Sequence, residues 1–155
     1  MLIEPLRVFI VEDEILLMMQ LEAFLQDAGH IVVGTAISSR EAKKVAAEIN
    51  ADIALIDIHL ADGPTGTEVG QFITDHTTMA AVFLTSNPKR IPENFAGAIG
   101  VIAKPYTEQG LFTALNYLIG AVRSPPPLVD LPRSLVLSPA YSQIWNTAKG
   151  STKTS

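Results

Sequence analysis

Three acidic side chains stand in a row near the amino terminus of this chain. The segment "VFIVEDEILL" covers residues 8–17 and contains Glu12, Asp13 and Glu14 directly after an apolar run. Adjacent carboxylates repel one another, and burial raises the cost of keeping them charged. Two explanations are open from this segment alone. Either the acids cap a helix and face water, or a cation lies among them.

Composition narrows the classes of protein to consider. The chain has 155 residues, of which 48% are hydrophobic, so we expect one domain with a substantial core. The absence of cysteine excludes disulfides and thiolate metal sites, and fits a cytoplasmic location. A net charge of −5 argues against direct nucleic-acid binding. No apolar run is long enough for membrane insertion, and the amino terminus lacks the basic region of a signal peptide.

Apolar runs typical of strands alternate with segments of helical spacing. Strands are expected at residues 6–11, 31–37, 52–57, 80–85 and 99–103, and helices at 14–28, 39–49, 68–75 and 107–122. Pro88 and Pro92 predict that a fourth helix between strands four and five is short or irregular. This alternation predicts an α/β fold of the flavodoxin-like, doubly wound type. Its sheet would have five parallel strands in the order 2-1-3-4-5, with helices on both faces.

The composition changes at residue 124. We expect a domain over residues 1–123 and a Pro-rich tail over residues 124–155 that is partly ordered or disordered, since this segment holds five of the ten prolines. The apolar run 135–137 and the single tryptophan, Trp145, argue against complete disorder. Packing of the tail against the domain, or binding of a partner by it, are the alternatives.

Four of the predicted strands end in polar residues. Glu12 and Asp13 follow the first strand, Asp57 ends the third, Thr85 ends the fourth, and Lys104 follows the fifth. Each residue has an ordinary explanation by itself: a helix cap, a turn, a β-former or a solvated surface charge. In the predicted topology, however, all of them lie at one carboxyl-end edge of the sheet, which is where such folds bind ligands. Their joint placement favours a functional site.

The motifs at these strand ends resemble a known family. They are "VEDE" at 11–14, "LIDIHL" at 55–60, "FLTS" at 83–86 and "AKPY" at 103–106. In this order and spacing, over residues 6–122, the sequence resembles the receiver (CheY-like) domains of two-component response regulators. The resemblance implies a stand-alone phosphorelay protein that is not an enzyme and that switches protein–protein interactions.

The resemblance also assigns a metal site. Asp13 and Asp57 would bind Mg²⁺ directly, together with the main-chain carbonyl of His59, and Glu12 would bind through a water molecule. Such a set of hard oxygen ligands suits Mg²⁺. Glu14 is then expected to lie in the first turn of the following helix and to favour the helix dipole.

The phosphate site follows from the same resemblance. Asp57 would be the phospho-acceptor, Thr85 would bind a phosphoryl oxygen, and Lys104 would pair first with Asp57 and then with the phosphate. The bond between Lys104 and Pro105 is usually cis in the family. Many receivers carry an aromatic residue three positions before this lysine, whereas this chain has Val101. Coupled switching of the threonine and the aromatic is therefore not expected in its usual form.

The expected partners are a histidine kinase or a phosphotransfer protein and a downstream protein, and a homodimer is left open. We expect the donor to dock on the first helix, near Met18 or Met19. Two other functions compete. The chain could be a receiver-like binding module without phosphorylation control, which Val101 favours. It could instead be a Mg²⁺-dependent phosphatase with an aspartyl nucleophile. That class needs Asp-x-Asp, and the comparable segment here ends in His59.

Overall fold

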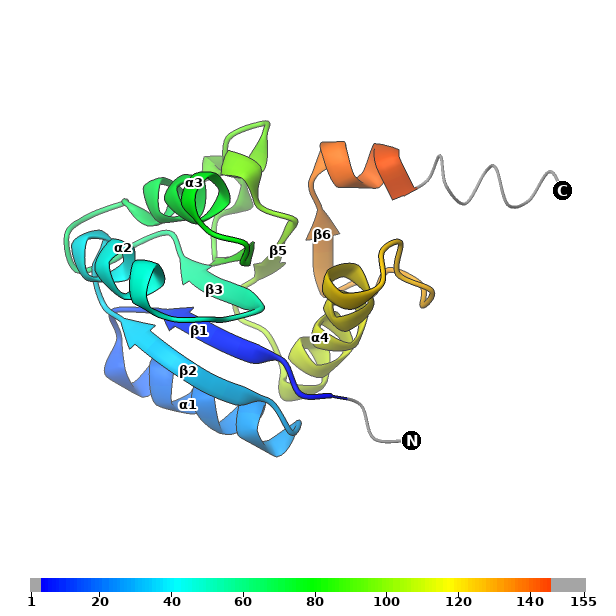
Figure 1. Cartoon of the computed structure of the whole chain (residues 1–155), viewed down its shortest axis with the longest axis horizontal. Helices are drawn as coiled ribbons and strands as arrows, with labels where there is room; N and C mark the ends of the chain where they lie inside the picture. Colours follow the sequence, from blue (N-terminus) through cyan, green and yellow to red (C-terminus); the bar gives the residue numbers. More distant parts are fainter. Residues whose placement is uncertain (1–3, 146–155) are drawn as a thin grey trace, which may run out of the picture.

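The computed structural model describes residues 4–145 as a six-stranded sheet between two layers of helices (Figure 1). The strands are β1 (Arg7–Val11), β2 (Ile31–Ala36), β3 (Ile53–Asp57), β4 (Ala80–Thr85), β5 (Gly100–Ala103) and β6 (Leu135–Leu137). Their order is β2-β1-β3-β4-β5-β6. The first five strands pair in parallel, as predicted, and β6 pairs antiparallel with β5. The predicted order 2-1-3-4-5 is therefore confirmed.

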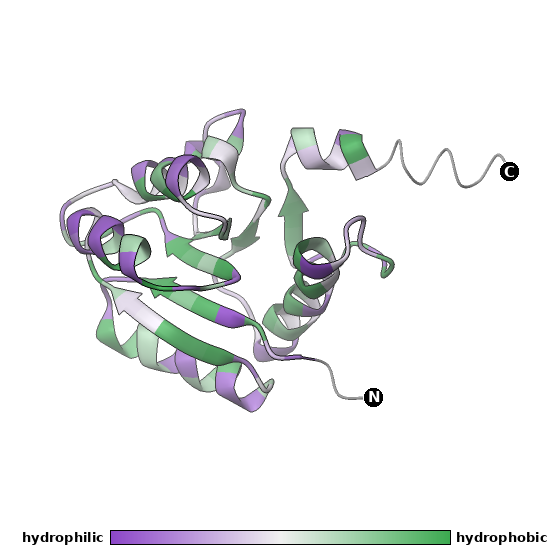
Figure 2. Ribbon diagram, viewed as in Figure 1, coloured by the Kyte–Doolittle hydropathy of each residue, from purple (hydrophilic) through white to green (hydrophobic). Residues whose placement is uncertain are grey.

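The central strands are buried on both faces, which explains their continuous apolar runs. Every residue of β3 is buried, and Figure 2 shows the hydrophobic colour along the middle of the sheet. Val11 of β1 is in register with Ile56 of β3, and Asp57 is in register with Leu84 of β4. Because the strands end almost level, the residues that follow them meet at one edge.

The long helices cover the two faces in pairs. They are α1 (Ile15–Asp27), α2 (Ser39–Glu48), α3 (Gly66–His76) and α4 (Glu108–Arg123). Side chains of α1 and α4 share one core, which includes Val8, Ile10, Leu21, Leu25 and Leu115. Side chains of α2 and α3 share the other, which includes Phe9, Ala42, Ala46, Val69 and Ile73. Within residues 4–145, no helix combines the length and the apolar character that crossing a membrane requires.

The helix starts agree with the sequence at α2 and differ at α1. Ser38 caps α2, and its hydroxyl oxygen accepts a hydrogen bond from the Glu41 amide at 3.1 Å. Glu14 was expected in the first turn of α1, but it is the residue before the helix and has extended backbone angles. Its side chain makes no capping hydrogen bond. The helix begins one residue later, at Ile15.

Two short 3₁₀ helices replace the fourth helix of the predicted fold. They are η1 (Pro88–Arg90) and η2 (Phe95–Gly97). Pro88 stands at the start of η1, and the backbone of Phe95 and Ala96 has positive φ angles of 53° and 48°. A regular α-helix tolerates neither internal prolines nor left-handed residues. The expected irregular fourth helix is confirmed.

The carboxyl-terminal segment adds a strand that the five-stranded prediction lacked. The amide of Ser138, just after β6, donates to the carbonyl of Ile99 at 2.8 Å. Residues 139–145 are helical, and the buried Trp145 packs against Tyr117 and Tyr141. The sequence did not predict β6 because three residues are too few for a periodic pattern. Residues 146–155 of the predicted tail lie outside the described part of the chain, and the boundary at residues 123 and 124 stays a prediction.

Candidate functional site

The ends of β1 and β3 bring three carboxylates together. Glu12 and Asp13 follow β1, and Asp57 is the last residue of the neighbouring β3. One carboxylate oxygen from each lies within 4.8 Å of the other two. Glu12 and Asp57 are buried, and Asp13 is partly exposed. The convergence expected from the strand order is therefore present in the structure.

Lys104 binds two of these acids at once. It follows β5, and its ammonium nitrogen lies 2.9 Å from Glu12 Oε1 and 2.9 Å from Asp57 Oδ2. Its main-chain amide donates to the carbonyl of Thr85 at 2.8 Å, which fixes the start of the loop after β5. The next peptide bond, Lys104–Pro105, is cis. The sequence paired Lys104 with Asp57, and the contact with Glu12 is a further finding.

Glu12 and Lys104 both have pKa values above their usual range. Burial, together with the neighbouring Asp57 carboxylate, raises the pKa of Glu12 to about 7. Burial alone would lower the pKa of Lys104, but its hydrogen bonds to Asp57 and Glu12 outweigh that effect and raise the pKa. Three carboxylates face one ammonium, so the ionised cluster carries an excess of negative charge. A cation with hard oxygen ligands fits this donor set.

The two oxygens of Asp57 have different partners. Oδ2 accepts from Lys104, and Oδ1 lies 3.3 Å from the main-chain amide of His59, which donates to it. His59 is exposed in the loop between β3 and α3. This hydrogen bond holds the His59 backbone beside Asp57, the residue that the sequence predicts to be the phospho-acceptor. The role of the His59 carbonyl as a metal ligand stays a prediction.

Gly66, the first residue of α3, lies close to the backbone of Asp57 and Ile58. A Cβ atom added to Gly66 would lie 2.1 Å from the carbonyl oxygen of Asp57 and 2.5 Å from Cα of Ile58. The amide of Gly66 also donates to the carbonyl of Ile58 at 2.9 Å. Only glycine fits this close backbone approach.

Thr85 lies at the same edge of the sheet, at the end of β4. It is buried, and its hydroxyl oxygen accepts a hydrogen bond from the Asn87 amide at 3.0 Å. Val101, in the neighbouring β5, is also buried and pairs with Phe83 on one side and Val136 on the other. The rotating aromatic side chain that many receivers carry at this position is therefore replaced by a smaller, buried one, Val101.

An apolar surface adjoins the site at the amino-terminal end of α1. Ile15, Leu16 and Met19 are exposed there, with Leu16 80% exposed, whereas Met18 packs partly into the core. Of the two methionines that the sequence singled out, Met19 is therefore the exposed one. A cavity of about 310 Å³ lies beside this surface and is lined by Leu17, Gln20, Ser86, Lys104, Pro105 and Tyr106.

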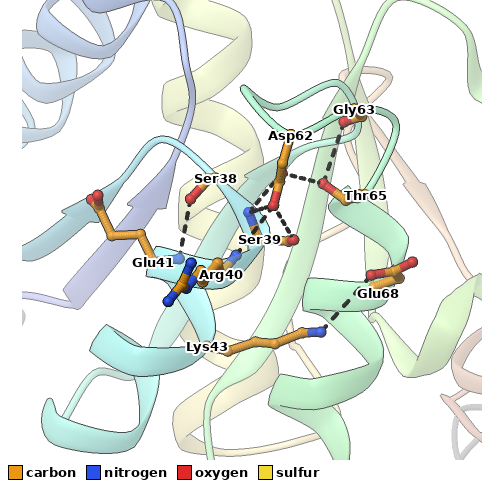
Figure 3. A network of polar contacts seen from close by, with 9 residues as sticks. All are labelled: Ser38, Ser39, Arg40, Glu41, Lys43, Asp62, Gly63, Thr65 and Glu68. Atoms are coloured by element: carbon orange, nitrogen blue, oxygen red, sulfur yellow. Dashed lines mark hydrogen bonds and ion pairs between the residues drawn. The ribbon is translucent and has the colours of Figure 1, made fainter.

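One polar cluster near the site was not found by sequence reasoning. Asp62, in the loop after β3, accepts hydrogen bonds from Ser39 and Arg40 of α2 and from Thr65 (Figure 3). The sequence signals were a capping motif at α2 and a loop rich in Gly and Asp. Neither signal shows that the two segments touch.

Comparison with known proteins gives the same family over most of the chain. Residues 8–116 match the family model described as the response regulator receiver domain. PhyR of Methylorubrum extorquens, a phyllosphere-induced regulator, is 37% identical over 85 residues, which are 54% of this chain and 32% of that protein. The transcriptional regulatory protein PdtaR of Mycobacterium tuberculosis is 29% identical over 122 residues, which are 77% of this chain and 59% of that protein. The chain therefore spans less than two thirds of either relative.

Solved structures agree with this result. The receiver domain of PhyR from Erythrobacter litoralis superposes with a TM-score of 0.67 at 29% identity, covering 81% of this chain and 97% of that one. The family match over residues 8–116 includes β3, β4, β5 and all of β1 after Arg7, and the ends of these strands carry the acidic cluster, Thr85 and Lys104. The chain belongs to the family of response regulator receiver domains.

Proposed function

We propose that this receiver domain accepts a phosphoryl group on Asp57, from a phosphohistidine of a histidine kinase or a phosphotransfer protein, and that the modification switches its protein–protein contacts. The observation that carries this proposal is the pair of 2.9 Å bonds from Lys104 to Asp57 and Glu12 beside the acidic cluster. Two buried carboxylates on one lysine, with a third acid in reach, repel one another, and this repulsion costs stability. The arrangement is explained if the acids bind a cation and Lys104 binds the anionic phosphoryl group.

The proposed reaction transfers a phosphoryl group from an imidazole nitrogen of the donor to a carboxylate oxygen of Asp57. A carboxylate oxygen of Asp57 attacks the phosphorus atom, the P–N bond breaks, and the electron pair leaves with the imidazole nitrogen of the donor. Such transfers depend on alignment and charge neutralisation more than on covalent assistance. Lys104 supplies one positive charge at the Asp57 carboxylate. We expect it to contact the phosphoryl oxygens after transfer, and the Thr85 hydroxyl to donate a hydrogen bond to one of them.

The metal in this proposal is Mg²⁺. Asp13, Asp57 and the carbonyl of His59 would bind it directly, and Glu12 through a water molecule. The close approach of the three carboxylates supports this assignment. A bound Mg²⁺ would neutralise charge that develops on the transferring group. The chain's own part is to hold the ligands in place before the metal arrives.

The donor is proposed to dock on the exposed end of α1. Ile15, Leu16 and Met19 offer apolar contacts there, and adaptable methionine contacts suit a protein partner. The cavity beside Lys104 continues this surface toward Asp57. The downstream partner, a homodimer and a cytoplasmic location stay predictions.

A binding module without phosphorylation control is the second candidate. Two observations favour it: the buried Val101, which replaces a rotating aromatic, and the 3₁₀ segments in place of a fourth helix. Incubation with Mg²⁺ and acetyl phosphate, followed by intact-mass measurement, separates the two candidates. We expect the wild type to gain one phosphoryl group and Asp57→Ala to gain none. The binding module would be supported if the wild type gained no mass and its spectrum did not change on adding beryllofluoride.

A further inference from the structure

We propose that Asp62 is a positioning residue for the metal-binding loop. In this view the Asp62 carboxylate anchors the loop between β3 and α3 to the start of α2, and thereby holds the backbone of His59 at the site. The inference rests on the proposed function, because it concerns the main-chain carbonyl of His59 as a Mg²⁺ ligand. It assigns a role to a residue whose hydrogen bonds go to α2 and Thr65 rather than to Asp57 or Lys104.

The anchor consists of hydrogen bonds between segments far apart in the sequence (Figure 3). Both carboxylate oxygens of Asp62 accept from the Ser39 amide, at 3.0 and 3.1 Å, and Oδ2 also accepts from the Ser39 hydroxyl. The Arg40 amide donates to Oδ2 at 3.4 Å, and the Thr65 hydroxyl donates to Oδ1 at 2.7 Å. One side chain thus joins α2 and two points of the loop.

These bonds complete the capping of α2. The first amides of a helix have no partner within the helix. Ser38 supplies partners for Glu41 and Ala42, through its hydroxyl and its carbonyl oxygen. Asp62 supplies them for the two preceding amides, those of Ser39 and Arg40. A carboxylate at this end of a helix is also favoured by the helix dipole.

The anchored point lies three residues beyond His59. On the site side, the loop is held by the buried side chains of Ile58 and Leu60. Its tip closes on itself through reciprocal bonds between Leu60 and Gly63, at 2.9 and 3.0 Å. Asp62 lies within this closed tip, so a shift of Asp62 moves Leu60 and the peptide bond between His59 and Leu60. That peptide contains the proposed ligand oxygen.

Two other links hold the same region, one to α2 and one to Ile37 just before it. Lys43 and Glu68 lie 3.8 Å apart, and both are exposed, so this pair contributes little. The Ala61 amide donates to the carbonyl of Ile37 at 2.9 Å, which holds only one peptide. The hydrogen bonds from Ser39 hold the pKa of Asp62 well below its usual range, so the carboxylate stays charged at neutral pH.

The test compares Mg²⁺ binding by the full chain carrying Asp62→Ala or Asp62→Asn with binding by the wild type. Isothermal titration calorimetry gives the Mg²⁺ dissociation constant, and amide hydrogen exchange reports residues 58–65. We expect Asp62→Ala to weaken Mg²⁺ binding about tenfold, the lower end of the range for residues that orient metal ligands. Asp62→Asn keeps one acceptor oxygen, so its Mg²⁺ dissociation constant is expected to lie between those of the wild type and Asp62→Ala. Exchange in the loop should accelerate in the same order.

Asp75→Ala is the matched control. Asp75 is an exposed aspartate of α3, and its side chain accepts a hydrogen bond from Gln71 of the same helix. It should bind Mg²⁺ as the wild type does. The labelling rate of Asp62→Ala with acetyl phosphate should return to the wild-type maximum at saturating Mg²⁺, which a general loss of folding would not allow. Equal Mg²⁺ affinity of Asp62→Ala and wild type overturns this inference alone. A wild type that binds no Mg²⁺ overturns the proposed function, and this inference with it.

Discussion

At the scale of single residues, the site holds more negative charge than its own lysine neutralises. Lys104 reaches Glu12 and Asp57, and Asp13 adds a third carboxylate within 4.8 Å. Burial is the main cause of the raised pKa of Glu12, and the neighbouring Asp57 carboxylate adds to it. Such a cluster costs folding stability and favours binding of a cation. Stability and metal affinity should therefore change in opposite directions when one acid is removed.

Asp13→Asn tests this opposition. Asp13 is partly exposed, and asparagine keeps its shape while removing one of the repelling charges. In EDTA we expect the variant to be more stable than the wild type by about 1 kcal/mol, the size of one screened carboxylate repulsion at this distance. With Mg²⁺ at about 100 times its dissociation constant, the wild type should gain about 2.7 kcal/mol and become the more stable of the two.

Chemical denaturation with and without Mg²⁺ measures both values for Asp13→Asn. Asp75→Asn serves as the control, because it removes an aspartate charge from the exposed face of α3. Mg²⁺ should not change which of the two, Asp75→Asn or the wild type, has the larger free energy of unfolding. If Asp13→Asn were less stable than the wild type in EDTA, the crowding argument would be wrong.

At the scale of elements, β1, β3, β4 and β5 place polar residues at their carboxyl ends, and α1 presents the surface beside them. The exposed apolar residues of α1 lie in its first two turns, whereas Leu21 and Leu25 pack into the core. Apolar residues therefore lie on more than one face of α1. One face stabilises the fold, and the other is available to a partner.

Charge substitution on the exposed face of α1 separates docking from chemistry. We expect Leu16→Glu and Met19→Glu to slow phosphotransfer from the histidine-containing donor about tenfold or more, the size of an apolar contact that matters at an interface. Labelling by acetyl phosphate, which needs no docking, should be unchanged. Leu128→Glu is the control, since Leu128 is 94% exposed in the segment after α4. Unchanged transfer from the donor to both α1 variants would remove this surface from the docking site.

The sequence predicted those elements whose signals are local. Strand ends could be located because apolar runs stop at polar residues, and the strand order followed from the alternation of strands and helices. That order placed Lys104 at the same edge as Asp57, and the family resemblance implied that the two would pair. The anchor by Asp62 could not be predicted, because it joins residues 23 positions apart and depends on how α2 and α3 pack. The second bond of Lys104, to Glu12, depends on side-chain geometry that no spacing encodes.

At the scale of the whole molecule, the carboxyl-terminal segment belongs to the core of the described structure. Leu135 and Trp145 are buried in the same cluster as Leu115 and Leu118 of α4. β6 also covers the edge of β5, which would otherwise be open. The sequence showed the apolar residues of this segment, but a pairing between β5 and a strand more than 30 residues later has no local signal.

Trp145→Ala tests how far this segment stabilises the domain. The buried indole packs against Tyr117 and Tyr141, so its loss should lower the free energy of unfolding by about 3 kcal/mol. Denaturation followed by circular dichroism measures this change, since the chain has no other tryptophan for fluorescence. The neighbouring Ile144 is exposed, and Ile144→Ala should change stability by less than about 0.5 kcal/mol. Equal effects of the two substitutions would contradict the packing described here.

The central claim is that Asp57 receives phosphate from a histidine-containing partner. The most direct test is transfer of labelled phosphate from a panel of autophosphorylated histidine kinases to the wild type and to Asp57→Ala, in the presence of Mg²⁺. We expect at least one kinase to label the wild type within minutes and none to label Asp57→Ala. Equal labelling of both proteins, or labelling of neither by any kinase or phosphotransfer protein, would contradict the account.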